Sequence, residues 1–465
     1  MSSIAFSSLH LKPAMLKNLA SLGYAAMTPI QAHSLPPILA GKDLIARAKT
    51  GSGKTAAFGI GLLSRLDTTA LQLQALVLCP TRELADQVAK ELRRLARFTE
   101  NIRVLTVCGG VPFGPQLGSL EHGAHVVVGT PGRLLDHLRR GSLDLSSLQT
   151  LVLDEADRML DMGFQDDIRS LIAAAPARRQ TLLFSATYPD SIADMSAAMQ
   201  QTPVEVSVDE DHVAGTIEQH FYAVEPDQRS EAVARILGRY RPESTLVFCN
   251  TKLDCQELAD ALKERGVAAL AIHGDLEQRE RDQVLVRFSN KSASVLVATD
   301  VAARGLDIKE LAAVINFELS RNPEVHTHRI GRTGRAGEQG LAISLVSRRD
   351  SRLIKGMEED LACRITLQEF SSLAPLSGRP PAAAMVTLCI DGGRKNKLRP
   401  GDILGALTGE GGIAGSEVGR IDLFDFHSYV AIMGQSVEQA LRCLSSNRIK
   451  GRFFKVRRIG SGRTS

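Results

Sequence analysis

The sequence predicts an α/β protein with two parallel-sheet domains in tandem, followed by a small α+β domain. A chain of 465 residues is longer than one hydrophobic core usually supports, which indicates several domains. Short apolar runs alternate with amphipathic helical stretches along most of the chain, as in parallel α/β folds. Three strand-and-turn segments of the first half also recur in the second half, in the same order. Residues 75–83 (ALVLCPTRE) match 245–253 (TLVFCNTKL), 105–110 match 270–275, and 126–130 match 295–299.

Two stretches without helical periodicity separate the predicted domains. Residues 207–215 (SVDEDHVAG) are polar and acidic, and residues 373–384 (LAPLSGRPPAAA) are rich in Pro, Gly and Ala. The domains are therefore expected at residues 1–206, 216–372 and 382–460. In open parallel sheets ligands bind at the carboxyl ends of strands, so the turns of the repeated segments should carry the chemistry.

The excess of positive charge lies at the C-terminal end of the chain. The net formal charge is +4, but residues 382–465 contain 13 Lys and Arg against 7 Asp and Glu. The rest of the chain is therefore slightly acidic, at −2. A basic end of this kind is either a solvated tail or a nucleic-acid-binding surface, and composition alone leaves both open.

The seven cysteines form no C-x-x-C pair, which predicts reduced thiols with no disulfide partner and no metal site. We also expect no secretory leader, because no basic stretch followed by an apolar stretch occurs at the start. No apolar run approaches the roughly 18–20 residues that span a bilayer, so no membrane association is expected. These observations predict a cytoplasmic protein.

Residues 48–55 (AKTGSGKT) match the phosphate-binding loop pattern, with Ala48 in place of the first glycine. Backbone N–H groups freed by Gly51 and Gly53 can surround phosphate oxygens at the start of the following helix. Lys54 would supply charge to the β- and γ-phosphates, and Thr55 a hydroxyl to Mg²⁺. A glycine-rich turn that only caps a helix is the alternative, and the intact G-K-T after a strand disfavours it.

Residues 151–157 (LVLDEAD) place acidic groups at the end of a buried strand. Asp154 can hold Mg²⁺, and Glu155 can orient and deprotonate the attacking water. Alone, this stretch could be an acidic helix cap. After a phosphate-binding loop, it indicates the metal-and-water half of a nucleoside triphosphatase site.

The second α/β copy has no phosphate-binding loop but contains HRIGRTGRAG at residues 328–337. Arg329, Arg332 and Arg335 recur every three residues and are expected on one side of a short helix. A merely solvated basic helix does not explain the interleaved glycines. Because an arginine from outside the nucleotide domain can raise phosphoryl-transfer rates by about 10³–10⁵, we expect Arg332 and Arg335 to complete the site.

Together these motifs resemble the DEAD-box RNA helicases from residue 6 to about residue 365. The resemblance implies two RecA-like domains and an ATP-dependent RNA helicase with ATP and Mg²⁺ as cofactors. Residues 23–31 (GYAAMTPIQ), within a region spanning 4–32, resemble the family's Q motif, which recognises adenine. By that likeness Gln31 bonds the adenine edge, Tyr24 stacks on the ring, and Phe6 is the upstream aromatic residue. The implied nucleotide-binding set is Phe6, Tyr24, Gln31, Ala48, Lys49, Thr50, Gly51, Ser52, Gly53, Lys54, Thr55 and Asp307, with Thr55 and Asp154 toward the metal.

The remaining family motifs imply an RNA-binding surface spread over both copies. Ser185–Thr187 (SAT) resembles the motif that links hydrolysis to unwinding, and residues 278–281 and 298–308 match motifs of the second domain. Hydroxyl, arginine and glycine groups of this kind grip phosphates and sugars without reading bases. The implied RNA contacts are Pro80, Thr81, Arg82, Gly110, Thr130, Arg133, His273, Gly274, Thr299, Arg304 and Gly305.

The third domain shows a β-α-β-β-α-β pattern, which is that of the RNA-recognition motif. Strands are expected at 385–390, 418–423, 427–433 and 453–459, and helices near 403–407 and 437–447. Tyr429 is present, but Ile432 stands where a second stacking aromatic residue is expected. The basic loops are therefore better candidates for RNA contact than the sheet. The candidates are Arg394, Lys395, Lys397, Lys450, Arg452 and Lys455.

The stretches GGRKNKLRPGDILGALTGEGGI and GRFFKVRR resemble the C-terminal module of the DbpA subfamily. The resemblance implies that the module tethers the helicase to 23S ribosomal RNA in precursors of the large ribosomal subunit. We also expect a monomer. An ATP-gated RNA clamp without obligatory unwinding is the alternative, because it needs the same residues. A DNA helicase is disfavoured by the Q motif together with the DEAD motif.

Overall fold

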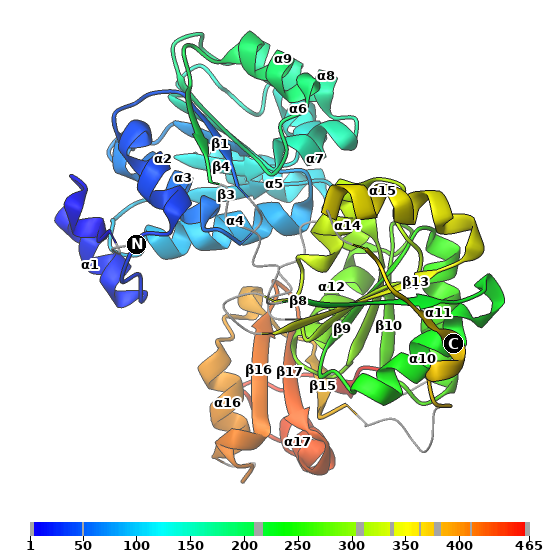
Figure 1. Cartoon of the computed structure of the whole chain (residues 1–465). Coiled ribbons are helices and arrows are strands. Elements are labelled where there is room, and N and C mark those ends of the chain that lie inside the picture. The colour runs from blue at the N-terminus through cyan, green and yellow to red at the C-terminus, as the bar shows by residue number, and fades with distance from the viewer. Residues whose placement is uncertain are drawn as a thin grey trace. The chain divides into compact units, whose positions relative to one another are not determined.

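The computed structural model describes residues 4–48, 51–208, 217–303, 311–334, 339–361, 364–375, 383–409 and 412–460. The chain divides into two compact units, Met1–His212 with Gly305–Asp307, and Val213–Arg304 with Ile308–Ser465. The first unit is one α/β domain, and the second unit contains the other α/β domain and the C-terminal module (Figure 1). The predicted fold class is confirmed.

The first unit is a parallel sheet of seven described strands in the order β3-β4-β2-β5-β6-β1-β7. Strand residues alternate between its two faces: Val152 packs in one buried cluster, and Leu151 and Leu153 pack in the other. Helices therefore cover both faces, as a nearly all-apolar strand requires. The strands are β1 (Leu44–Arg47), β2 (Ala75–Leu78), β3 (Val104–Val107), β4 (Val126–Gly129), β5 (Thr150–Asp154), β6 (Gln180–Ser185) and β7 (Val204–Ser207). The helices are α1 (Pro13–Ser21), α2 (Pro29–Leu39), α3 (Lys54–Arg65), α4 (Arg82–Leu95), α5 (Phe113–Glu121), α6 (Pro131–Arg139), α7 (Ala156–Asp161), α8 (Gln165–Ala174) and α9 (Asp190–Met199).

The second α/β domain repeats this topology strand for strand. Its described strands follow the order β10-β11-β9-β12-β13-β8-β14, so each strand occupies the place of one strand in the first sheet. The duplication predicted from the three repeated segments is confirmed, and it extends to all seven strands. The strands are β8 (Ile217–Ala223), β9 (Thr245–Cys249), β10 (Ala269–Ile272), β11 (Val295–Thr299), β12 (Ala313–Asn316), β13 (Gly340–Val346) and β14 (Leu367–Glu369). The helices are α10 (Arg229–Tyr240), α11 (Lys252–Glu264), α12 (Gln278–Ser289), α13 (Asp300–Ala303), α14 (Pro323–Ile330) and α15 (Ser351–Leu361).

The C-terminal module is a four-stranded antiparallel sheet in the order β16-β17-β15-β18, with α16 and α17 packed on one face. The predicted β-α-β-β-α-β order is confirmed. Figure 1 shows this module in orange and red. Its elements are β15 (Met385–Ile390), α16 (Pro400–Thr408), β16 (Val418–Leu423), β17 (Ser428–Met433), α17 (Val437–Ser446) and β18 (Val456–Arg458).

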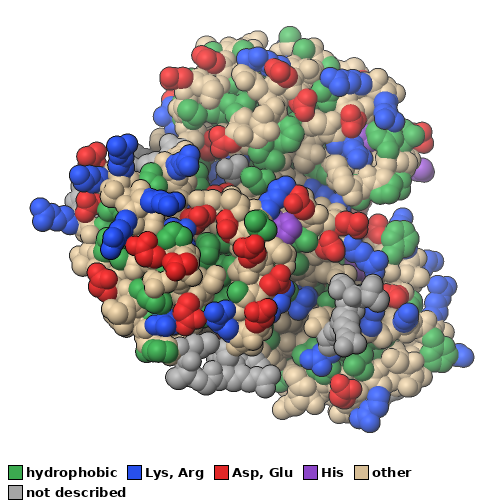
Figure 2. Space-filling view, turned by 90° about the vertical axis from the view of Figure 1, so that its right-hand side faces the viewer, with side chains coloured by type: hydrophobic (Ala, Val, Ile, Leu, Met, Phe, Trp, Pro, Cys, Tyr) green, Lys and Arg blue, Asp and Glu red, His purple; other side chains and the backbone are tan. Residues whose placement is uncertain are grey.

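Basic and acidic side chains are interspersed on the face shown in Figure 2. None of the helices that the structure describes is long and apolar enough to cross a membrane. The six cysteines within the described ranges are all buried, and none of them is joined to another by a disulfide.

Candidate ATPase and RNA-binding site

The phosphate-binding loop connects β1 to α3. Gly51 and Gly53 have φ angles of 92° and 98°, which L side chains rarely adopt. A Cβ atom on Gly53 would also lie 2.5 Å from Nε2 of Gln31. The backbone can therefore turn here only with glycine, and its N–H groups stay at the helix start, where anions bind. Lys49 and Thr50 lie outside the described residues.

Lys54 is the first residue of α3 and is buried, with 6% of its surface exposed. Its Nζ atom donates a hydrogen bond to the Ala48 carbonyl oxygen across the loop, at 2.8 Å. Thr55, half-buried, follows it in the same helical turn. The ammonium group therefore lies within the loop and can exchange a carbonyl acceptor for phosphate oxygens.

Asp154 ends β5 and Glu155 follows it directly, as the sequence predicts, and both are at least 95% buried. Glu155 has left-handed backbone angles (φ 55°, ψ 53°), a conformation that costs a non-glycine residue about 1 kcal/mol or more. Burial raises the pKa of Asp154 to about 7, and the nearby Lys54 opposes this increase. Oδ1 of Asp154 has no hydrogen-bond partner within the described part of the chain. A buried carboxylate oxygen without a donor suits a cation.

Asp157 connects the end of β5 to the end of β6. Its Oδ2 atom accepts hydrogen bonds from the backbone N–H groups of Ala186 and Thr187, at 3.2 and 3.0 Å, and from the Thr187 hydroxyl at 3.1 Å. The Ser185 hydroxyl accepts from the Asp157 N–H at 3.3 Å. The acidic turn and the SAT segment are thus one hydrogen-bonded unit, so a shift in one moves the other.

Gln31 joins the adenine-recognition segment to the phosphate-binding loop. Its Oε1 atom accepts from the Thr28 N–H at 2.9 Å, and its Nε2 donates to the Gly53 carbonyl oxygen at 3.2 Å. Tyr24 donates from its hydroxyl to Glu91 at 2.8 Å, and its ring meets Phe6 edge-on with centroids 6.0 Å apart. Gln31 thus contacts the loop, while Tyr24 and Phe6 contact each other, and all three residues predicted for adenine already have protein partners.

The predicted RNA contacts of the first domain lie on loops that follow neighbouring strands. Thr81 and Thr130 are the N-caps of α4 and α6, after β2 and β4. Arg82 donates to the Gly110 carbonyl oxygen at 3.3 Å. Because β3, β4 and β2 are adjacent and parallel, the structure brings these groups together at one sheet edge. Pro80 belongs to the same edge, directly before Thr81.

Gln116 on α5 is a positioning residue that the sequence did not indicate. It is buried; its Oε1 accepts from Arg133 Nη1 at 3.0 Å and lies 3.1 Å from Nε2 of His137. Its Nε2 donates to the Cys108 carbonyl oxygen at 2.8 Å. Gln116 therefore fixes the guanidinium of Arg133 at the edge where the RNA contacts are predicted. No motif of the sequence includes it, so no local pattern indicates its role.

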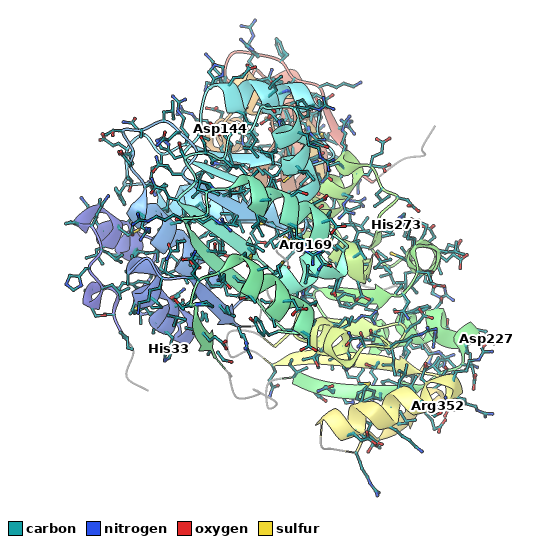
Figure 3. All side chains as sticks on the ribbon, turned by 90° about the horizontal axis from the view of Figure 1, so that it is seen from above. His33, Asp144, Arg169, Asp227, His273 and Arg352 are labelled. Carbon is teal, nitrogen blue, oxygen red and sulfur yellow. The ribbon has the colours of Figure 1, made fainter. Side chains whose placement is uncertain are left out.

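In the second domain, His273 and Gly274 follow β10 and Thr299 ends β11, on adjacent parallel strands. His273, labelled in Figure 3, lies 3.3 Å from Gln256 through its Nε2 atom. Thr299 accepts a hydrogen bond from the Ala302 N–H at 3.4 Å. The structure therefore brings these three predicted contacts to one sheet edge. Arg304, Gly305 and Asp307 lie outside the described residues.

The predicted single helix carrying all three arginines is wrong. Helix α14 ends at Ile330, so Arg332 lies in the turn that follows. Arg329 is 2% exposed and forms a bidentate pair with Asp300, with both N–O distances 2.7 Å. Its other donors bond the carbonyl oxygen of Glu318 and the side chain of Asn250, which assigns Arg329 a structural role. Arg335 lies outside the described residues.

The basic loops of the module lie together. Arg394, Lys395 and Lys397 are exposed, and Nζ of Lys450 donates to the Lys397 carbonyl oxygen at 2.8 Å. Arg452 and Lys455 are also exposed on the segment that follows. Four or more positive charges thus reach solvent from two loops held in contact, an arrangement suited to a phosphate backbone.

The expectation that Ile432 occupies a stacking position is wrong. Successive residues of a strand face opposite sides, so Tyr429 and Ile432, three apart, cannot share a face. Ile432 packs with Val430 in the core beneath α16 and α17, whereas Tyr429 is on the other face and is fully buried.

These features define a nucleoside triphosphatase with a duplicated α/β fold and an added basic module. The DEAD/DEAH box helicase family matches residues 28–195, the helicase conserved C-terminal domain 228–337, and the DbpA RNA binding domain 387–458. The ATP-dependent RNA helicase DbpA of Escherichia coli is 55% identical over 97% of this chain and 99% of its own length. DeaD of Mycobacterium tuberculosis is 35% identical, over 98% and 94%.

Solved structures of two other proteins are similar to most of this chain. Saccharomyces cerevisiae Dbp5 bound to RNA and ADP BeF3 has a TM-score of 0.72 and 30% identity, covering 79% of this chain and 96% of that one. Mss116p bound to single-stranded RNA and AMP-PNP also reaches 0.72, with 27% identity, over 79% and 80%. The chain belongs to the DEAD-box ATP-dependent RNA helicases, in the DbpA subfamily.

Proposed function

We propose that this helicase unwinds short RNA duplexes locally while its C-terminal module holds it on 23S ribosomal RNA, in precursors of the large ribosomal subunit. The observation that carries the proposal is the pair of basic loops joined by Lys450 and Lys397. The core contacts offer hydroxyl, arginine and glycine groups, which grip any RNA. Selectivity must therefore come from the module. We further propose that the enzyme acts as a cytoplasmic monomer.

Within the ATPase site, Lys54 binds the β- and γ-phosphates, and Thr55 and Asp154 hold Mg²⁺. The described residues contain no cluster of three or more His, Cys, Asp or Glu side chains around a metal position. One carboxylate and one hydroxyl nevertheless suit Mg²⁺, which usually takes its other ligands from water and phosphate. When bound, Mg²⁺ would neutralise charge on the β- and γ-phosphate oxygens.

Glu155, placed beside Asp154 by the turn after β5, orients the attacking water and accepts its proton. Arg332 and Arg335 neutralise the charge that develops on the γ-phosphate, and Asp307 binds the ribose. Arg335→Ala should lower turnover by about 10³–10⁵ while changing ATP affinity far less. Single-turnover ATP hydrolysis and equilibrium ATP binding separate the two effects. Equal losses in both would instead assign Arg335 to ground-state binding.

The tether is tested with the full chain by ATPase rates on 23S ribosomal RNA, an unrelated RNA of equal length and single-stranded DNA. Ribosomal RNA should stimulate hydrolysis at the lowest concentration, and DNA least. Lys395→Ala with Lys397→Ala should remove the preference for ribosomal RNA and leave stimulation by abundant generic RNA unchanged. The slope of log affinity against log salt should become shallower by about one unit per lost phosphate contact.

The matched control is Lys42→Ala with Lys90→Ala, which removes the same charge from two exposed positions of the first domain. The control should keep the ribosomal preference, whereas an equal loss in both variants would show a general charge effect. Strand-displacement measurements on the same samples test the clamp alternative. RNA-stimulated hydrolysis with no displacement of short duplexes would favour a clamp.

A further inference from the structure

Arg158 lies three residues after the proposed base Glu155, in the first turn of α7, and the two side chains form a buried ion pair. Arg158 is 6% exposed and Glu155 is 5% exposed. Nε of Arg158 lies 3.5 Å from Oε2 of Glu155. Arg158 follows the acidic motif at residues 151–157 but is not part of it, so the motif assigns it no role. The contact nevertheless brings a cation to the group that should activate water.

The carboxylate of Glu155 is not used to cap its own helix. Glu155 is the N-cap of α7, a position whose side chain normally accepts a hydrogen bond from the first helical turn. Within α7 it accepts no such bond. Oδ1 of Asp157 instead accepts from the Arg158 N–H at 3.0 Å, while its Oδ2 bonds the SAT segment. Asp157 therefore fixes the start of α7, and the Glu155 carboxylate lies beside the Arg158 guanidinium.

Three carboxylates are buried within four residues, those of Asp154, Glu155 and Asp157. Like charges that are buried close together repel each other. Hydrogen bonds hold Asp157, and the nearby Lys54 stabilises the charge of Asp154. Arg158 is in position to hold the third carboxylate against this repulsion. Without the guanidinium, the Glu155 side chain should leave its orientation.

The hydrogen bonding of Arg158 differs from that of Arg329, the buried arginine with a structural role. All three side-chain nitrogens of Arg329 have acceptors within the second domain. Nη1 of Arg158 is enclosed and has no hydrogen-bond partner in the part of the chain that the structure describes. A buried charged donor without an acceptor is costly, and native proteins keep that cost mainly at functional sites. Arg158 is therefore poorly explained by packing alone.

We propose that Arg158 is a positioning residue for ATP hydrolysis: its guanidinium holds the Glu155 carboxylate in the orientation from which Glu155 binds and deprotonates the attacking water. Arg158 acts through Glu155, whereas Arg332 and Arg335 act on the γ-phosphate. Because a displacement of about 1 Å can lower a rate by about 10²-fold, the ion pair should affect turnover and not ATP affinity. This inference rests on the proposed role of Glu155.

Substitution of Arg158 in the full chain tests the inference. Arg158→Gln removes the charge and should lower the RNA-stimulated turnover of ATP by up to about 10²-fold. The KM for ATP and the equilibrium affinity for AMP-PNP should change little. Arg158→Lys restores a cation without the planar fork and should recover part of the turnover. Equal losses of turnover and nucleotide affinity, or no recovery with Lys, would overturn the positioning role.

The matched control is Arg169→Gln on α8. Arg169, labelled in Figure 3, pairs with Asp166 at 3.7 Å with the same three-residue spacing, but both side chains are exposed. This variant should keep normal turnover. Urea unfolding and AMP-PNP-dependent RNA binding verify that each variant is folded. If Arg158→Gln does not fold, Arg158→Lys alone decides: reduced turnover with unchanged AMP-PNP affinity supports the role, and unchanged turnover overturns it.

A double-mutant cycle shows whether Arg158 acts through Glu155. The four enzymes are the unmodified chain, Glu155→Gln, Arg158→Gln and the double variant, and single-turnover hydrolysis with excess enzyme measures each rate. Since Arg158 has nothing to position once the carboxylate is gone, the double variant should be no slower than Glu155→Gln. Multiplied losses would show that Arg158 acts independently, which would overturn the proposal.

The same cycle separates this inference from the proposed function on which it rests. Normal turnover in Glu155→Gln would reject Glu155 as the base, and the positioning role of Arg158 would be rejected with it. Impaired turnover in Glu155→Gln together with normal turnover in Arg158→Gln would reject the positioning role alone. The expected result is a loss in both single variants, no further loss in the double variant, and nucleotide-dependent RNA binding in all four enzymes.

Discussion

The two α/β domains share one sheet topology, but the charged side chains at equivalent positions have different partners in the two domains. Strand pairing aligns Thr150 of β5 with Ala75, and Ala313 of β12 with Thr245, so Glu155 and Glu318 occupy equivalent positions. Lys54 and Arg229 are likewise the first residues of equivalent helices, α3 and α10.

In the second domain the equivalent charges neutralise each other. Arg229 donates to Glu318 at 2.9 Å, and its other nitrogen lies 3.6 Å from Asp350. In the first domain Lys54 instead bonds a loop carbonyl oxygen, and Asp154 keeps a raised pKa. One fold therefore supports either a closed ion pair or part of an ATPase site, depending on the residues at two strand ends.

The comparison predicts the largest effect at Glu155. Glu155→Gln removes the proposed base and should lower ATP turnover by about 10²–10⁴. Nucleotide and RNA binding should persist as a long-lived, ATP-dependent complex. The matched variant is Glu318→Gln, which changes the equivalent carboxylate of the other domain and should leave turnover nearly unaltered. Quench-flow measures ATP hydrolysis, and filter binding measures the RNA complex, in both variants. Normal turnover in Glu155→Gln would show that Glu155 is not the base.

The helix-start residues should separate binding from stability. Lys54→Ala should weaken ATP binding by roughly 1.5–3 kcal/mol, the usual value of a hydrogen bond to a charged group, with little change in unfolding. Arg229→Ala should instead lower the unfolding free energy of the second domain by a similar amount, since it removes the cation that Glu318 and Asp350 share. Calorimetric ATP titration measures the ATP affinity of each variant, and urea unfolding measures its stability. Parallel effects in the two variants would show that the domains do not differ as described.

Much of this organisation could be predicted from sequence because it is encoded locally. Each repeated segment is a strand followed by its own functional turn. The position of a motif such as GKT or DEAD in the fold is therefore set by the strand directly before it. Adjacent parallel strands then bring Thr81 and Thr130 to one edge without further information.

What sequence reasoning missed depends on contacts distant in sequence or on strand parity. Asn290 and Thr387 are 97 residues apart, and no local pattern indicates that they meet. The spacing from Tyr429 alone misplaces Ile432, because residues three apart in a strand lie on opposite faces. Arg329 belongs to a run with Arg332, but only the position of Asp300 and Glu318 shows that it is structural.

The last prediction is a pH dependence of opposite sign in the two domains. Asp154 has a folded pKa of about 7, above its ordinary value, so the folded state retains a proton that the unfolded state loses. Its contribution to stability is therefore lost as pH rises from about 4 to about 7. Burial lowers the pKa of His326 to about 4, so its contribution is lost as pH falls from about 6.5 toward 4.

Each group can change the unfolding free energy by at most about 1.4 kcal/mol per pH unit. His326 stacks near Phe221 at 6.4 Å, so His326→Phe keeps an aromatic ring and removes the titration. Hydrogen exchange of peptides from each domain, without nucleotide and at pH 5 and 7, should show the second domain losing its acid sensitivity in His326→Phe. Asp154→Asn should remove the loss of stability between pH 5 and 7 from the first domain only. If the pH dependence of a domain's stability persists after its titrating residue is replaced, other groups cause that dependence. The two buried sites would then not differ as proposed.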